Sequence, residues 1–231
     1  MANNLDLGQH FLKDETVLEK IASQVEAKTD EEVLEIGSGP GTLTRALKKH
    51  VQNLMCVELD PQFDAPEGVS YVQESAVRHL GKKCYPVIVG NIPYHISEPL
   101  LHAVLTCQPR RAVFVVGKKL ATLLQEESML GTYVRNCYDI QQVLDIDRSL
   151  FTPPPRVDSS LIILTKKPVE KPVLEVLRTR NTSTVKNALT YALRGKKTKR
   201  EVRELLADYS ERDTPVYQLS TSSFFELLKK L

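Results

Sequence analysis

The sequence predicts an α/β protein with a mostly parallel, seven-stranded sheet and a small C-terminal all-α domain. Two observations lead to this prediction. Over residues 1–167, short apolar runs that are typical of buried parallel strands alternate with segments of helical periodicity. From residue 168 the character of the chain changes: Pro168 and Pro172 mark a linker, and short helical patterns follow it.

The residues before the first predicted strand are predicted to form a helix that begins after a polar residue. Asp14 is placed to cap a helix over residues 17–25, where apolar residues recur at helical spacing. The N-terminus lacks the basic region and apolar core of a signal peptide, and no apolar run approaches the roughly 18 residues of a membrane span. We therefore expect a cytoplasmic protein that does not associate with a membrane.

The four cysteines of the chain are scattered and form no C-x-x-C pair. They are Cys56, Cys84, Cys107 and Cys137. In a cytoplasmic protein this pattern predicts isolated buried thiols and argues against a zinc site, so we expect no bound metal.

Residues 33–44, VLEIGSGPGTLT, contain the first strand, a glycine-rich turn and the start of a helix. The glycines stand at alternate positions, Gly37, Gly39 and Gly41, and the acidic Glu35 precedes them. Glycine lets the backbone turn sharply and lets a ligand approach where a Cβ would clash. The G-x-G-x-G spacing differs from the dinucleotide pattern and suits S-adenosylmethionine, which has no pyrophosphate to place at the helix N-terminus. A glycine turn without a ligand is the alternative.

The second predicted strand, over residues 54–58, ends in Glu58, 17 positions after the last glycine of the loop. An acid at the tip of this strand is well placed to accept hydrogen bonds from both hydroxyls of a ribose. An exposed acid at a strand end is the alternative interpretation. Residues 60–68 then leave room for little more than a turn before the third predicted strand, 69–72.

The motif NIPYHIS at 91–97 follows the fourth predicted strand and suits methyl transfer to the exocyclic amine of a base. Such an amine is a poor nucleophile that must be held in line with the sulfonium methyl. Asn91 supplies an amide oxygen, and Pro93 stiffens the loop and leaves the carbonyl of Ile92 free to face the substrate. Tyr94 offers an aromatic face for a flipped base. A proline turn with a buried tyrosine is the alternative.

The rest of the first domain alternates between strand and helix patterns. Strands are predicted over 86–90, 112–116, 138–146 and 161–164, and helices over 98–105 and 118–127. Between the last two strands, FTPPPRVDSS contains three consecutive prolines, which favour an extended segment. Phe151, ahead of the prolines, is expected either to be exposed near the active site or to pack in the core.

The second predicted domain, residues 168–231, is helical and basic. Its helical patterns cover 173–178, 184–193, 199–209 and 222–231. Residues 166–203 hold 12 Lys/Arg against 3 Asp/Glu, whereas the whole chain has a net charge of only +2. This asymmetry suggests a phosphate-rich partner, although a solvated helix surface has the same composition. The residues expected to contact phosphates are Arg194, Lys196, Lys197, Lys199 and Arg200.

Five motifs in this order resemble one family across nearly the whole chain. It is the rRNA adenine N6,N6-dimethyltransferases, which modify two adjacent adenosines near the 3′ end of small-subunit rRNA. The motifs are GQHFL at 8–12, EIGSGPGTLT at 35–44, Glu58, NIPYHIS at 91–97 and FTPPPRVDSS at 151–160. RTRNTSTVKNAL at 178–189 and the ending QLSTSSFFELLKKL are more similar to archaeal members than to bacterial ones.

The resemblance implies a Rossmann-like class I methyltransferase fold over 1–167 and an rRNA-docking domain over 168–231. It also implies S-adenosyl-L-methionine as the cofactor and the immature small ribosomal subunit as the partner of a monomeric enzyme. The implied cofactor-binding residues are His10, Leu12, Gly37, Gly39, Glu58, Ser75 and Asn91. The implied catalytic residues are Asn91, Ile92, Pro93 and Tyr94, with Tyr94 and Phe151 on the side of the substrate base. Because the sulfonium is already activated, no strong general base is required.

The sequence departs from the family in three places. Ser75 stands where the family usually has Asp, so an uncharged hydroxyl would accept from the adenine amine of the cofactor. The residues 117–119 are Gly-Lys-Lys where the family tends to have Gln-Lys-Glu, and the helix after Glu58 is largely missing. Two alternatives therefore stay open: a small-subunit assembly factor with weak or no methyltransferase activity, and a methyltransferase for another RNA adenine.

Overall fold

The computed structural model describes residues 8–126, 128–168, 175–176 and 183–230 of the 231-residue chain. Contacts divide the chain into two compact units, one made of residues 1–122 and 138–166, the other of 123–137 and 167–231. The sequence predicts a single domain boundary after residue 167, which would place residues 123–137 in the first domain, together with the sheet. Each unit is described by itself below.

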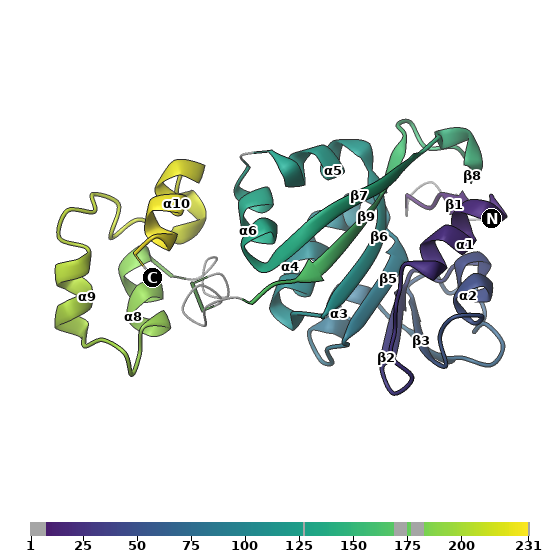
Figure 1. Ribbon diagram of the computed structural model, residues 1–231, viewed down its shortest axis with the longest axis horizontal. Coiled ribbons are helices and arrows are strands. Elements are labelled where there is room, and N and C mark those ends of the chain that lie inside the picture. Colours follow the sequence, from purple (N-terminus) through teal and green to yellow (C-terminus); the bar gives the residue numbers. More distant parts are fainter. Residues whose placement is uncertain (1–7, 127, 169–174, 177–182, 231) are drawn as a thin grey trace. The chain divides into compact units, whose positions relative to one another are not determined.

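The first unit is built on a seven-stranded sheet in the order β4-β3-β2-β5-β6-β9-β7 (Figure 1). Its strands are β2 (Glu32–Ile36), β3 (Asn53–Glu58), β4 (Ser70–Gln73), β5 (Val87–Asn91), β6 (Arg111–Gly117), β7 (Tyr138–Ile146) and β9 (Ser159–Lys166). The first five of these in sheet order run parallel, and β9 pairs antiparallel with both β6 and β7. The predicted seven-stranded, mostly parallel sheet is therefore confirmed.

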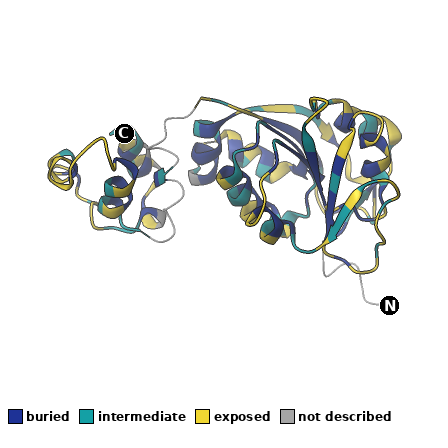
Figure 2. Ribbon diagram, turned by 90° about the horizontal axis from the view of Figure 1, so that it is seen from below, coloured by how far each residue is buried: buried dark blue, intermediate teal, exposed yellow. Residues whose placement is uncertain are grey.

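The sheet is covered on both faces by helices, which explains why its strands read as continuous apolar runs. The helices are α1 (Glu15–Ser23), α2 (Thr42–Leu47), α3 (Ala76–Leu80), α4 (Ser97–Cys107) and α5 (Lys118–Gln125). Side chains of α1 and α2 form one core cluster with Val87, Val89 and Val113 of the central strands. Figure 1 shows α3 and α4 on the other side of the sheet from α1 and α2. Most of the sheet is coloured as buried in Figure 2.

Two helix boundaries show how local sequence sets these elements. Asp14 caps α1, since its side chain accepts a hydrogen bond of 2.9 Å from the backbone N–H of Val17, as its position predicts. The helix α3 was not predicted from the sequence, because its five residues are too few to show a helical period. It begins directly after Ser75 and therefore fixes the backbone at the tip of β4.

A two-stranded sheet joins parts of the chain that the sequence treats separately. The strand β1 (Phe11–Leu12) pairs antiparallel with β8 (Phe151–Thr152), and a cis peptide bond links Thr152 to Pro153. The N-terminal GQHFL motif and the proline-rich segment thus lie side by side. Neither strand has the length or the alternation that would reveal it in the sequence.

The prediction of four isolated thiols is wrong for one pair of cysteines. Cys84 and Cys107 form a disulfide, with 5.1 Å between their Cα atoms, whereas Cys56 and Cys137 are buried thiols. Cys84 lies just before β5, and Cys107 ends α4, the helix that follows β5. The strand and the helix run back past one another, so two cysteines that are 23 residues apart in sequence meet in space.

The second unit is helical. It contains α6 (Met129–Cys137), α8 (Val185–Ala192), α9 (Lys199–Leu205) and α10 (Thr221–Leu228), and the rings of Tyr133 on α6 and Phe224 on α10 stack with centroids 4.9 Å apart. The helix predicted over 173–178 lies mostly outside the described residues. The helix α9 ends four residues earlier than predicted, and α6 was not predicted at all. Among the residues that the structure describes, no helix is both long and apolar enough to cross a bilayer.

Candidate active site

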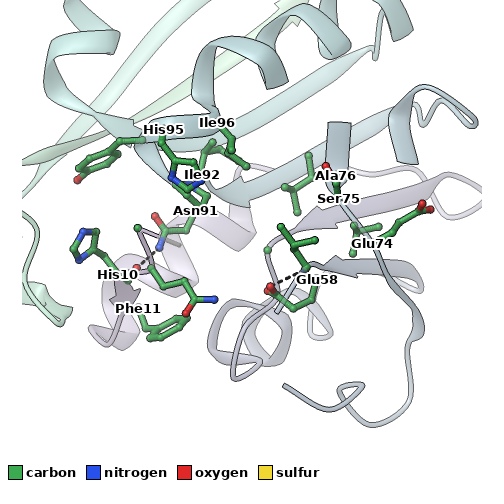
Figure 3. A pocket seen from close by; sticks show the side chains of 18 of the residues that line it. His10, Phe11, Glu58, Glu74, Ser75, Ala76, Asn91, Ile92, His95 and Ile96 are labelled. Carbon is green, nitrogen blue, oxygen red and sulfur yellow. Dashed lines mark hydrogen bonds between the residues drawn. The ribbon is translucent and has the colours of Figure 1, made fainter. Parts of the chain in front are cut away.

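A cavity of about 860 Å³, partly open to solvent, lies at the carboxyl ends of β2, β3, β4 and β5. Six segments line it, namely 8–11, 36–37, 57–59, 74–76, 91–96 and Phe151 (Figure 3). They include the N-terminal motif, the glycine loop and NIPYHIS, which are distant in sequence.

The glycine loop forms one wall of this cavity, but its glycines have different places. Gly37 lines the cavity with φ +71°, and its N–H donates to the carbonyl of Val57 at 2.8 Å. Gly39 has φ +48° and lies against the ring of Phe11, where a Cβ would come within 2.7 Å of a ring carbon. Gly37 is thus the residue whose bare backbone faces the cavity, whereas Gly39 makes room for Phe11.

Glu58 lines the cavity but is also bound to the backbone around it. It is 6% exposed, and its Oε2 accepts a hydrogen bond of 2.8 Å from the N–H of Gly39. Its Oε1 accepts from the N–H groups of Leu59 and Asp60, both at 2.8 Å. An ionised carboxylate has about four acceptor sites, so three backbone bonds leave room for a ligand. The expectation from the sequence, an acid that faces only a ribose, did not include these three bonds.

Glu35, the acid ahead of the glycines, lies beneath the loop and outside the cavity lining. It is fully buried on β2, and its Oε2 accepts a hydrogen bond of 3.3 Å from the thiol of Cys56. Burial raises the pKa of this carboxyl group to about 7. Its Oε1 has no hydrogen-bond partner within the part of the chain that the structure describes.

Asn91 is oriented by the N-terminal motif. Its Nδ2 donates a hydrogen bond of 2.7 Å to the backbone carbonyl of His10, and Figure 3 draws this bond across the cavity. The amide has only one oxygen, so this bond leaves the Oδ1 acceptor of Asn91 available to a ligand. The following residue, Ile92, is buried, and its N–H is held by the carbonyl of Val115 on β6 at 2.9 Å.

Tyr94 is held at two places. Its hydroxyl shares a hydrogen bond of 2.9 Å with Ser159 Oγ, and burial raises the pKa of the phenol. Its ring lies over Gly117 at the end of β6, where a Cβ would come within 3.4 Å of the ring. The predicted proline turn with a tyrosine is present, and Tyr94 is half-buried and lines the cavity.

His10 lies beside Tyr94, with 5.9 Å between the ring centroids. Its Nδ1 lies 2.8 Å from the carbonyl oxygen of Pro153. Because a carbonyl can only accept, Nδ1 carries the hydrogen and Nε2 remains as an acceptor in the neutral ring. Another residue of the same motif, Gln9, donates to Asp60 Oδ2 at 2.9 Å and ties the motif to the segment after Glu58. Sequence reasoning missed this last bond, although Gln9 is part of GQHFL.

The side chains of Leu12 and Phe151 both belong to the core. Leu12 is 2% exposed, packs in the core cluster and does not line the cavity. Phe151 is 1% exposed, so its packing in the core, and not its exposure, is the correct alternative. Phe151 still forms part of the cavity wall.

Ser75 lies at the tip of β4 and lines the cavity next to Glu74. Its hydroxyl makes no hydrogen bond to any residue that the structure describes, and it does not cap α3. The carboxylate of Glu74 accepts from His79 Nδ1 at 2.7 Å and from Lys82 Nζ at 2.5 Å. Of these two side chains at this end of the cavity, Ser75 is therefore the one whose polar group is available to a ligand, and it is the residue that the resemblance implies.

The predicted phosphate contacts belong to the second unit. Arg194, Lys196, Lys197, Lys199 and Arg200 are all exposed and lie in or next to the loop between α8 and α9. Arg200 pairs with Glu204 at 2.9 Å. Within the described residues, no group of His, Cys, Asp and Glu side chains is arranged to hold a metal ion.

Comparisons with known proteins agree with this geometry. The profile of the family described as "Ribosomal RNA adenine dimethylase" matches residues 1–201. A protein of Methanopyrus kandleri named "Probable ribosomal RNA small subunit methyltransferase A" is 32% identical over 231 residues, with 89% of this chain and 83% of that protein covered. A Thermotoga maritima protein named "Ribosomal RNA small subunit methyltransferase A" is 30% identical over 204 residues, with 79% and 73% covered.

Two solved structures share the fold. A dimethyladenosine transferase from Plasmodium falciparum has a TM-score of 0.64 and 22% identity, with 96% of this chain and 97% of that chain covered. The 23S rRNA methyltransferase ErmE has a TM-score of 0.61 and 22% identity, with 96% and 99% covered. Both likenesses extend beyond the sheet over nearly the full length of the chain.

Proposed function

This chain belongs to the ribosomal RNA adenine dimethylase family, and we propose that its substrates are two adjacent adenosines near the 3′ end of small-subunit rRNA. It is an S-adenosylmethionine-dependent rRNA adenine dimethyltransferase. The names of the Methanopyrus and Thermotoga relatives support the small subunit as the substrate. The observation that carries the catalytic assignment is the Asn91–His10 hydrogen bond, which turns an amide oxygen towards the ligand.

The cavity fits S-adenosylmethionine, which when bound supplies a methyl group on a positively charged sulfonium. We assign one ribose hydroxyl to the remaining acceptor site of Glu58 and the purine amine to the hydroxyl of Ser75. The bare backbone of Gly37 allows close approach of the ligand. His10 lies at the opposite end of the cavity lining from Ser75 (Figure 3), and its Nε2 has no hydrogen-bond partner among the residues that the structure describes. Leu12 and Gly39 would support this site indirectly, through the packing of β1 and Phe11.

The target base is assigned to the space beside Tyr94. The ring of Tyr94 is fixed by Ser159 and Gly117, so it offers a rigid face for a base that has left its stack. The Asn91 amide oxygen and the Ile92 carbonyl would accept from the two N–H groups of the N6 amine and hold its lone pair towards the methyl group. Pro93 has no N–H and keeps this loop stiff. The proton leaves the amine after the transfer, so no buried base is needed.

The helical unit is assigned to rRNA docking. Its exposed cations in and next to the α8–α9 loop match a phosphate backbone in charge. We propose that the enzyme acts as a cytoplasmic monomer on the immature small subunit, where the target strand is accessible. The first unit then carries the chemistry, and the helical unit supplies affinity for rRNA.

The test is to incubate immature small and large ribosomal subunits separately with S-adenosylmethionine labelled in its methyl group and to map the labelled bases. We expect label on two adjacent adenosines of the small-subunit rRNA, each carrying two methyl groups. Asn91→Ala, which we expect to bind the same RNA, serves as the control. Label confined to large-subunit rRNA, or to a single adenosine elsewhere, would show that the substrate assignment is wrong.

A further inference from the structure

Three exposed side chains, Asn187 and Tyr191 on the outward face of α8 and Arg194 in the turn that follows the helix, form what we call the α8 stripe. Asn187 and Tyr191 are four positions apart, so they lie above one another on the same side of the helix, and Arg194 follows two residues after the last helical residue, Ala192. The opposite face packs into the helical unit through Val185, Ala188, Leu189 and Ala192. The stripe is therefore presented by a helix whose position is set by its own core.

Tyr191 is an unusual side chain to expose. It is 54% exposed and is one of three large hydrophobic side chains that are exposed among the described residues. The other two, Leu59 and Val157, lie at the active site: Leu59 lines the cavity, and the Val157 carbonyl lies 3.5 Å from the Tyr94 hydroxyl. The Tyr191 hydroxyl has no hydrogen-bond partner in the part of the chain described, so packing does not explain its position.

The loop that follows the stripe has a defined shape. The N–H of Arg194 donates to the carbonyl of Tyr191 at 3.2 Å, and the N–H groups of Lys196 and Lys197 both donate to the carbonyl of Leu193 at 2.9 Å. Gly195 makes this turn with φ +86°, a conformation that favours glycine, and no atom comes within 4 Å of where a Cβ would stand. The space above the loop is open on the side of Gly195.

The charges around the stripe are almost all positive. Residues 191–203 contain six Lys/Arg and a single acid, Glu201. Glu201 is engaged in the capping box of α9, where its carboxylate accepts from the N–H and the hydroxyl of Thr198. Arg194 and Lys197 form no ion pair within the described residues, so they are available to an anionic partner.

We propose that the α8 stripe binds single-stranded RNA, with an unpaired base stacked on Tyr191 and its flanking phosphates held by Arg194 and Lys197. The proposal rests on the proposed function and specifies which part of the rRNA the helical unit binds, namely unpaired nucleotides. An exposed aromatic ring beside cations is the combination that recognises unpaired nucleotides, because every base offers a π-face and every linkage a negative charge. A duplex offers the phosphates only, since its bases are already stacked. The helical unit thus selects unpaired rRNA rather than helices.

The chain contains no tryptophan, and Tyr191→Trp therefore creates a full-length protein with a single, exposed reporter. We expect an unstructured RNA oligonucleotide to quench its fluorescence by more than half at saturation. A blunt RNA duplex of equal length and heparin, a polyanion without bases, should bind without such quenching. Gln52→Trp is the matched control, because residue 52 is exposed just before β3, at the edge of the sheet away from the cavity. Equal quenching by heparin, or none by the single strand, would overturn the proposal.

A second measurement covers the case in which the reporter disturbs the site. Tyr191→Phe keeps the ring and should bind the single strand like the wild type, whereas Tyr191→Ala should bind it about 5- to 150-fold more weakly, since stacking is worth about 1–3 kcal/mol per base. Duplex affinity should be the same in all three proteins. Equal single-strand affinities of Tyr191→Ala and wild type would also overturn the proposal. Both readouts are made without cofactor, so single-strand binding as expected, together with a wild type that does not methylate small subunits, would contradict the proposed function alone.

Discussion

The side-chain amide of Asn91 and the backbone carbonyl of His10 are joined by a hydrogen bond of 2.7 Å, although the two residues are 81 positions apart. The bond selects one of the two orientations of the Asn91 amide, because only the nitrogen can donate to a carbonyl. A short N-terminal segment thereby controls which atom the catalytic loop presents to its substrate. The same segment pairs with the strand that holds Phe151.

The first prediction follows from this bond. Asn91→Ala removes the oriented acceptor, and we expect single-turnover methyl transfer to fall by about 10²- to 10³-fold, as when one preorganised hydrogen-bonding group is lost from an active site. Calorimetry should show cofactor affinity within a few-fold of wild type. Asn53→Ala is the matched control, because Asn53 also donates to a backbone carbonyl, that of Thr29, but on the surface. Methyl incorporation equal to wild type in Asn91→Ala would mean that the base is oriented by other groups.

The second prediction concerns Glu58. Glu58→Ala leaves three backbone N–H groups without their acceptor and removes the proposed ribose contact. Hydrogen bonds to charged groups are worth about 1.5–3 kcal/mol each, so S-adenosylhomocysteine should bind at least about 10-fold more weakly and the melting temperature should fall. Glu67→Ala, at an exposed acid nearby in sequence, should change neither quantity. A lower melting temperature with unchanged ligand affinity would limit Glu58 to a structural role.

The third prediction concerns the pH dependence of stability. Burial raises the pKa of Glu35 from an ordinary value of 4.5 to about 7, so the native state holds this proton more tightly than the unfolded state does. The unfolded state then binds fewer protons between these two pH values, and the free energy of unfolding falls as the pH rises from about 4.5 to about 7. At about 1.4 kcal/mol per pKa unit, this single group accounts for a loss of about 3 kcal/mol.

Urea unfolding at pH 5 and pH 8 measures this loss. Glu35→Gln has no proton to release, so the difference between the two pH values should be smaller than in wild type by about 2.5 kcal/mol, since part of the loss has already occurred at pH 5. Glu67→Gln controls for the removal of a negative charge from the surface. If the free energy of unfolding falls equally in Glu35→Gln and wild type between pH 5 and pH 8, another group of the protein holds the proton.

The fourth prediction concerns the salt dependence of RNA binding. Replacement of the five expected phosphate contacts by Gln (Arg194, Lys196, Lys197, Lys199 and Arg200) should weaken binding to a small-subunit rRNA fragment and flatten the plot of log affinity against log salt. Counterion release lowers the slope by about 0.7–0.9 for each phosphate contact that is lost. Because Arg200 already pairs with Glu204, we expect fewer than five contacts to disappear. Unchanged cofactor affinity is the internal control, and a salt slope equal to wild type would place the docking surface elsewhere.

The sequence by itself determined the parts of this protein that local patterns encode. Mostly apolar runs such as 33–36 and 112–116 predicted the strands, because a strand that is buried on both faces is largely apolar; Glu35 is the exception. The glycine loop, Glu58 and NIPYHIS were recognisable as site segments because each must follow a strand of a parallel sheet, whose carboxyl ends converge on one edge. Helices α3 and α6 were not predicted from the sequence. The first is too short to show a helical period, and in the second Gly131, Thr132 and Val134 lower the helix propensity.

Only the tertiary structure decided how these segments meet. The Cys84–Cys107 disulfide, the pairing of Leu12 with Phe151 and the three backbone bonds of Glu58 all join residues by packing, not by spacing. Whether a side chain such as Leu12 faces the core or the cavity depends on the direction of its Cα–Cβ bond after folding. The sequence specifies the kind of side chain at each position, whereas the residue that this side chain contacts depends on how the whole chain folds around the core.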